Sequence, residues 1–172
     1  AGCSLACVLD GDIHERLKSR VKAILDIQIK EFKNKLDTKT NPIISRRDGY
    51  SVWEHGLWVK GLAAASHLLP SYQKEIHIMG GYISRWVLDG FKDFNGKLYV
   101  PYVIKSNGTW ENNPSKGLSR WCLPAIQLLD KFERSGLTKE ENDKITAILE
   151  QFKEIQPPTG GGWPDSSKWN LF

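Results

Sequence analysis

The sequence contains few cysteines and no long apolar run. Its 172 residues include Cys3, Cys7 and Cys122, and an odd number of cysteines is a poor basis for a disulfide framework. No apolar stretch approaches the roughly 20 residues that a transmembrane helix requires, so we expect no membrane span. No signal-peptide pattern is recognisable near the N-terminus. Free thiols and the missing signal pattern together favour a cytoplasmic location.

Sequence motifs typical of common enzyme classes are also missing. The sequence has no phosphate-binding GxxxxGK[ST], no HExxH, no paired CxxC and no GxSxG. These absences count against P-loop nucleotide hydrolysis, a zinc-peptidase site and the usual α/β-hydrolase nucleophile. The four histidines are scattered, and His55 and His67 are separated by about 18 Å along one predicted helix, too far to share a metal ion. We therefore expect neither a metal nor a cofactor.

The charge balance excludes another class of partner. Lys and Arg number 24 and Asp and Glu number 20, a formal net charge of +4, and the longest basic run is Arg46-Arg47. Nucleic-acid-binding proteins usually carry a basic stripe or a larger excess, so no nucleic-acid partner is expected. With 40% hydrophobic and 26% charged residues, the composition is that of a globular protein, and residues 1–172 are expected to form a single helical domain.

The spacing of apolar residues predicts a mainly α fold. It is a five-helix orthogonal bundle or an array of helical hairpins, with helices near residues 12–36, 50–69, 71–91, 118–135 and 138–155. In the first helix, the inward positions are predicted to be Ile13, Leu17, Val21, Ile24, Gln28, Phe32 and Leu36. Helix 50–69 is apolar around nearly its whole circumference, so it should be the most buried.

Local signals add detail to this pattern. Gly80-Gly81 interrupts the third helix, which close packing against a neighbour would explain. Thr138 and Glu141 form a capping-box sequence before the last helix. Asn-Gly pairs flank alternating apolar residues and predict a small β-hairpin excursion near 97–105, which Pro101 confines to a sheet edge.

Two groups of residues are candidates for a functional site. Asp48 and Glu54 could act as the acid and base of a catalytic site, because a carboxylate beside Trp in an apolar setting can have a raised pKa. The alternative is structural: Asp48 caps the helix and Glu54 pairs with an Arg such as Arg46 or Arg85. The candidate ligand-binding residues are mostly aromatic and comprise Trp53, His55, Tyr102, Trp110, Trp163 and Trp169.

The C-terminal residues 157–172 form an aromatic tail. Three consecutive glycines make its ordering costly, at about 1–2 kcal/mol of backbone entropy per residue. Burial of each large apolar side chain would stabilise the ordered tail by roughly 1.5–3 kcal/mol. We therefore expect the tail to dock on its own domain or on a partner.

Two functions of different classes follow. The first is a non-catalytic helical module, of a structural, regulatory or viral type, that binds a protein partner or a second copy of itself through aromatic loops and the tail. The second is a carbohydrate-active enzyme domain, a glycoside hydrolase or polysaccharide lyase, with Asp48 and Glu54 as acid and base and a glycan as ligand. Its helical hairpins with Trp, Tyr and carboxylates in the loops resemble those of the α/α-barrel carbohydrate enzymes. The missing motifs favour the first function.

Overall fold

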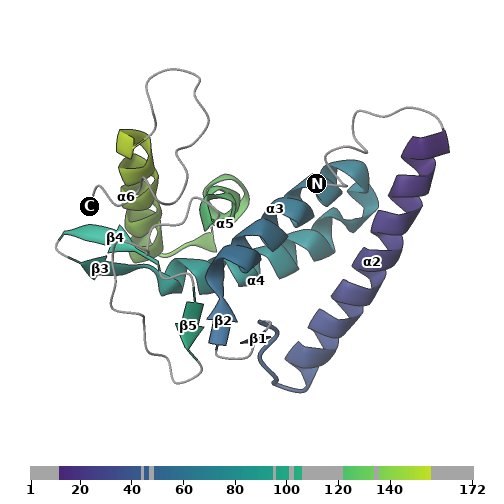
Figure 1. Cartoon of the computed structure of the whole chain (residues 1–172), viewed down its shortest axis with the longest axis horizontal. Helices are drawn as coiled ribbons and strands as arrows, with labels where there is room; N and C mark the ends of the chain where they lie inside the picture. Colours follow the sequence, from purple (N-terminus) through teal and green to yellow (C-terminus); the bar gives the residue numbers. More distant parts are fainter. Residues whose placement is uncertain are drawn as a thin grey trace.

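A computed structural model describes residues 12–43, 45–46, 49–94, 96–100, 103–105, 122–133 and 136–155. Within these ranges the mainly α prediction is confirmed (Figure 1). The five α-helices are α2 (Asp12–Asp37), α3 (Val52–Leu68), α4 (Gln73–Gly90), α5 (Leu123–Leu128) and α6 (Lys139–Ile155). The predicted Asp48, Tyr102 and Trp110 and the tail 157–172 lie outside the described residues.

In the described part of the chain, five short strands form two antiparallel sheets. One has the order β1-β2-β5 and the other pairs β3 with β4, with bounds β1 (Ser45–Arg46), β2 (Gly49–Ser51), β3 (Lys92–Phe94), β4 (Lys97–Tyr99) and β5 (Val103–Lys105). The predicted excursion near 97–105 therefore contains two strands, but β4 and β5 pair with other strands and not with each other. The turn at Gly96, which has a φ of 78°, pairs β4 back onto β3.

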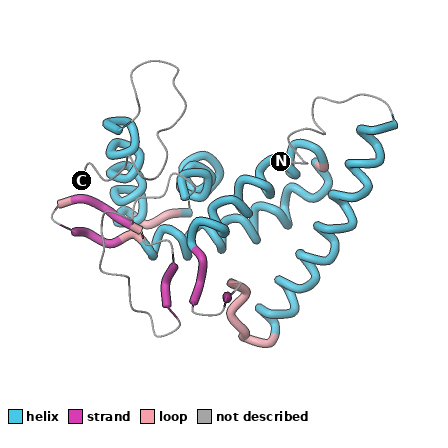
Figure 2. Tube along the Cα trace, in the orientation of Figure 1, coloured by secondary structure: helices cyan, strands magenta, loops and turns pink. Residues whose placement is uncertain are grey.

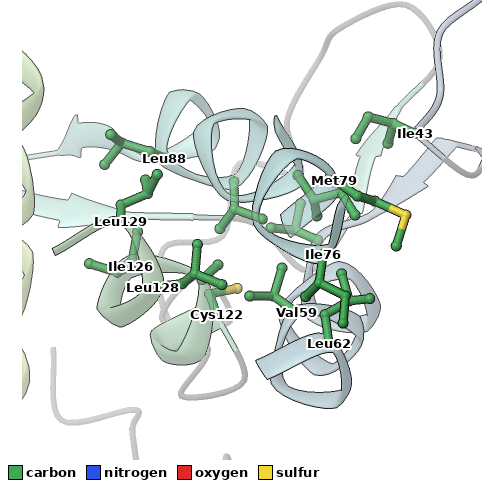
Figure 3. Close-up of a cluster of buried hydrophobic side chains, with 14 of the residues drawn as sticks. Ile43, Val59, Leu62, Ile76, Met79, Leu88, Cys122, Ile126, Leu128 and Leu129 are labelled. Carbon is green, nitrogen blue, oxygen red and sulfur yellow. The ribbon is translucent and has the colours of Figure 1, made fainter. Parts of the chain in front are cut away.

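Helices α3 and α4 form a hairpin at the centre of the molecule. Leu69 between them leaves the helical conformation, with φ −130° and ψ 74°, as expected before Pro70, which begins a short 3₁₀ helix (Pro70–Tyr72). α4 contacts α2, α3 and α5, and α3 contacts α4 and α5, so these two helices lie at the centre of the packing. Of the side chains described on α3, which was predicted to be the most buried helix, only Lys60 and His67 are exposed. Figure 3 shows the apolar core, with Val59 and Leu62 of α3 close to Ile126 and Leu128 of the α5 region.

Gly80 explains how the helices of this core approach one another. An added Cβ at Gly80 would lie 3.3 Å from Leu128 Cδ1 and 3.8 Å from Leu62 Cδ1. The absence of a side chain on α4 at this point makes room for α3 and α5 together. The prediction that the Gly80-Gly81 pair serves close packing is confirmed at Gly80.

Gly61, by contrast, occupies a place where a methyl group fits. It lies within α3, and an added Cβ would meet no atom within 4 Å. We expect Gly61→Ala to raise the free energy of unfolding by about 0.5–1 kcal/mol, because alanine loses less backbone entropy in a helix. Urea unfolding monitored by circular dichroism measures this change. Gly80→Ala should gain less, because Leu128 must move, and an equal gain at both positions would contradict the packing described for Gly80.

The inward face of α2 differs from the prediction at three positions. Leu25 and Phe32 are buried, whereas Ile24 is exposed. Two contacts set this rotation: Trp58 Nε1 donates to Gln28 Oε1 at 3.3 Å, and the Phe32 ring meets the edge of Tyr82 at a centroid distance of 5.6 Å. Because each residue advances a helix by about 100°, placing Leu25 inside turns Ile24 outward. Ile13 and Leu36, also predicted inward, are exposed as well.

Within the described residues, the helix predicted near 118–135 is observed from Leu123, and residues 118–121 lie outside them. Pro124 lies in the first turn of α5, which continues as a π-helical turn over Leu129–Glu133. Before α6, Glu141 N donates to Thr138 Oγ1 at 3.2 Å and Thr138 N donates to Glu141 Oε2 at 2.7 Å. The predicted capping box is therefore confirmed.

Candidate functional site

Only some of the predicted site residues lie in the described part of the chain. Trp53, Glu54 and His55 lie in the first turn of α3. The positive end of the helix dipole there stabilises a negatively charged carboxylate such as that of Glu54. The Glu54 side chain is half-buried. Arg85, one predicted partner of Glu54, has its Nε 4.0 Å from Glu141 Oε1 of α6. Since Asp48 is not described, its pairing with Glu54 stays a prediction, as do the ligand roles of Trp163 and Trp169.

His55 is the centre of an aromatic cluster between α3 and α4. Its ring centroid lies 4.9 Å from that of Trp86 and 6.0 Å from that of Trp58. Tyr50 of β2 completes the cluster, with its ring centroid 6.1 Å from that of Trp86. His55 is only 3% exposed, while both Trp side chains are half-buried. The cluster joins the start of α3 to α4, and contact between His55 and a ligand stays a prediction.

The backbone holds the His55 ring in one orientation. Its Nδ1 lies 2.6 Å from the Ser51 carbonyl oxygen, and because a carbonyl only accepts, Nδ1 carries the proton. Burial lowers the pKa of His55, and this effect exceeds the opposing effects of the Ser51 carbonyl and the Glu54 charge. His55 is therefore neutral in the folded protein at neutral pH.

This lowered pKa predicts a loss of stability in mild acid. The unfolded chain takes up a proton at His55 below about pH 6.5, and the folded chain resists it, so stability decreases as the pH falls from 6.5 toward the folded pKa. Each unit by which the pKa is lowered corresponds to about 1.4 kcal/mol. Urea midpoints between about pH 7.5 and 5 measure the slope, because this range spans the unperturbed value. His55→Asn should reduce it, and the same change at the exposed His67 should not. An unchanged slope in His55→Asn would contradict the assignment.

A feature that sequence reasoning missed lies on the outer face of α2. Ile24 and Ile27 are 56% and 59% exposed, and they are three residues apart, so they are neighbours on one helix face. Arg20 and Glu31, both exposed, extend this face by one turn at each end. We call these four residues the outer α2 face. The available signal was an excess of apolar residues on α2: Ile24 and Leu25 are adjacent, so they cannot both face the core.

A groove runs along the C-terminal half of α2 where it meets the start of α4. Its volume is about 960 Å³, and its lining includes Ile27 and Glu31 together with Tyr72 and Glu75. Its walls are linked by polar contacts: the Tyr72 hydroxyl donates to Asp26 Oδ1 at 2.6 Å, and Lys33 Nζ lies 3.8 Å from Glu75 Oε1. The hydrogen bond from Tyr72, followed by the one from Lys22, lowers the pKa of the Asp26 carboxyl.

Two classes of site are missing from the described part of the chain. Among those residues, no group of three or more His, Cys, Asp or Glu side chains could hold a metal ion. None of the helices found there is both long enough and apolar enough to cross a membrane. Cys122, the one described cysteine, is buried and forms no disulfide.

The described part of the chain is thus mainly helical, and its notable features are a close-packed core, one buried histidine and an exposed apolar helix face. In comparisons with protein-family models, curated proteins and solved structures, no family model, protein or structure matches the chain.

Proposed function

We propose that the chain is a non-catalytic helical binding and assembly module that meets a protein partner through the outer face of α2. The observation that carries the proposal is the exposure of Ile24 and Ile27 side by side. Single exposed apolar residues are common, but adjacent large ones framed by charged residues are typical of interaction surfaces.

The position of α2 supports this function. α2 lies along one side of the molecule, away from α5 and α6 (Figure 2). Its inner face is already occupied, since Leu25 and Phe32 belong to the core. The outer face is therefore free to bind another molecule without disturbing the fold. The predicted aromatic tail, with Trp163 and Trp169, would add a second contact region.

Site-specific photo-cross-linking tests the proposal. A photoreactive residue replaces Ile27 in the full chain, and in a matched protein it replaces Ile78 of α4, which is 54% exposed. After illumination in an extract of the source cells, we expect a discrete cross-linked product from position 27 and none from position 78. Ile24→Glu should abolish the product, because it places a charge on the same surface. The proposal fails if position 27 gives no product, or if Ile24→Glu leaves its yield unchanged.

A further inference from the structure

The side chains of the outer α2 face are complementary to those of a second α2 helix that runs in the opposite direction. Arg20, Ile24, Ile27 and Glu31 follow one another at spacings of four, three and four residues. At 3.6 residues per turn, these spacings keep all four on one face. The two isoleucines form the middle, and residues of opposite charge stand at equal distances on either side.

The charges at the two ends have no partner within the described chain. Neither Arg20 nor Glu31 forms an ion pair there, whereas Lys22 pairs with Asp26 at 3.0 Å and Lys33 lies 3.8 Å from Glu75. Those two pairs reach toward Tyr72 and α4, across the groove whose lining also includes Ile27 and Glu31. Arg20 and Glu31 are thus available for an intermolecular contact.

From this arrangement we infer that the partner of the outer α2 face is a second copy of the chain, bound through an antiparallel α2 pair; the inference rests on the proposed function. A two-fold axis between Ile24 and Ile27 places Ile24 on Ile27 of the partner, and Arg20 opposite Glu31 of the partner, twice. A parallel pair would place Arg20 beside Arg20 and Glu31 beside Glu31, so like charges oppose that orientation.

The expected association is weak. A contact through one helix from each subunit lies at the lower end of interface sizes, where association is in the micromolar range. Two features give it specificity: the isoleucine pair at the centre, and the two Arg–Glu pairs that select the antiparallel orientation. The dimer should therefore be present at high protein concentration and dissociate on dilution.

Charge reversal tests the orientation. Arg20→Glu alone gives two Glu–Glu contacts, and Glu31→Arg alone gives two Arg–Arg contacts, so each variant should self-associate at least tenfold more weakly by sedimentation velocity. An equimolar mixture of the two variants should form a heterodimer, because every contact is again Arg with Glu. Both residues are exposed, so the fold should be retained, which circular dichroism checks.

Charge reversals on α6, at the exposed Glu150 and Lys153, serve as controls and should leave association unchanged. The inference is overturned if the natural chain stays monomeric at about 100 µM, well above a dissociation constant of a few micromolar, or if the mixture of variants associates no better than each alone. A monomeric chain that still cross-links from position 27 to another protein would overturn the second copy as partner and leave the proposed function standing. Failure of the cross-link itself would overturn the proposed function.

Discussion

Phe91→Ala is expected to lower the free energy of unfolding by about 3–5 kcal/mol. Phe91 is fully buried at the junction of α4 and β3, and its backbone N–H closes α4 by donating to Leu88 O at 3.1 Å. Removing the ring takes away apolar contacts and leaves a cavity that the surrounding helices cannot fill without moving. Because α4 contacts α2, α3 and α5, the loss should affect the whole domain.

Urea unfolding monitored by circular dichroism measures this effect. Ile78→Ala is the matched control: the side chain lies within α4, the helix that Phe91 closes, and is more than half exposed, so its removal should cost less than about 0.5 kcal/mol. A cost at Phe91 no larger than the cost at Ile78 would show that the α4–β3 junction is not part of the core.

Gln151→Leu is expected to destabilise the β3–β4 hairpin by about 1–3 kcal/mol. In a hairpin closed by Phe94 and Lys97, the next pair, Asp93 and Leu98, does not exchange hydrogen bonds, so the Leu98 N–H and C=O point away from β3. Gln151 of α6 satisfies both: Leu98 N donates to its Oε1 at 3.0 Å, and its Nε2 donates to Leu98 O at 2.9 Å. Leucine retains most of the volume and leaves both backbone groups without this partner.

Hydrogen exchange localises the effect. The Leu98 amide should exchange faster in Gln151→Leu, together with a lower urea midpoint for the whole chain. Gln127 of α5 is exposed and provides the control, because Gln127→Leu removes no bond to the hairpin. Unchanged exchange at Leu98 would contradict the role assigned to the Gln151 side chain.

The helices and their ends could be predicted from the sequence because their causes are local. Pro70 interrupts the helical hairpin, and Thr138 and Glu141 satisfy the first amides of α6 by reciprocal bonds. Gly80 signalled close packing because a helix tolerates glycine where a side chain has no room. The strand partners of β4 and β5 could not be predicted in the same way, since pairing depends on residues distant in the sequence.

The outer face of α2 was missed for a physical reason. Apolar periodicity identifies a helix, but adjacent apolar residues such as Ile24 and Leu25 leave its rotation undetermined. That rotation depends on contacts from residues 30 to 50 positions away, such as Trp58 with Gln28 and Tyr82 with Phe32. Similarly, the sequence identified His55 as a candidate residue but could not predict that Trp58 and Trp86 pack around its ring.

Sedimentation equilibrium of the full chain, compared with Ile24→Glu and Ile78→Glu, tests most directly whether the outer α2 face joins two copies. Ile24 and Ile78 are almost equally exposed, so the two variants remove nearly the same apolar area and differ only in its location. At about 100 µM, above the expected dissociation constant, the natural chain and Ile78→Glu should have twice the mass of one chain, and Ile24→Glu the mass of one. A natural chain with the mass of one copy, or an equal loss of mass in both variants, would contradict the account.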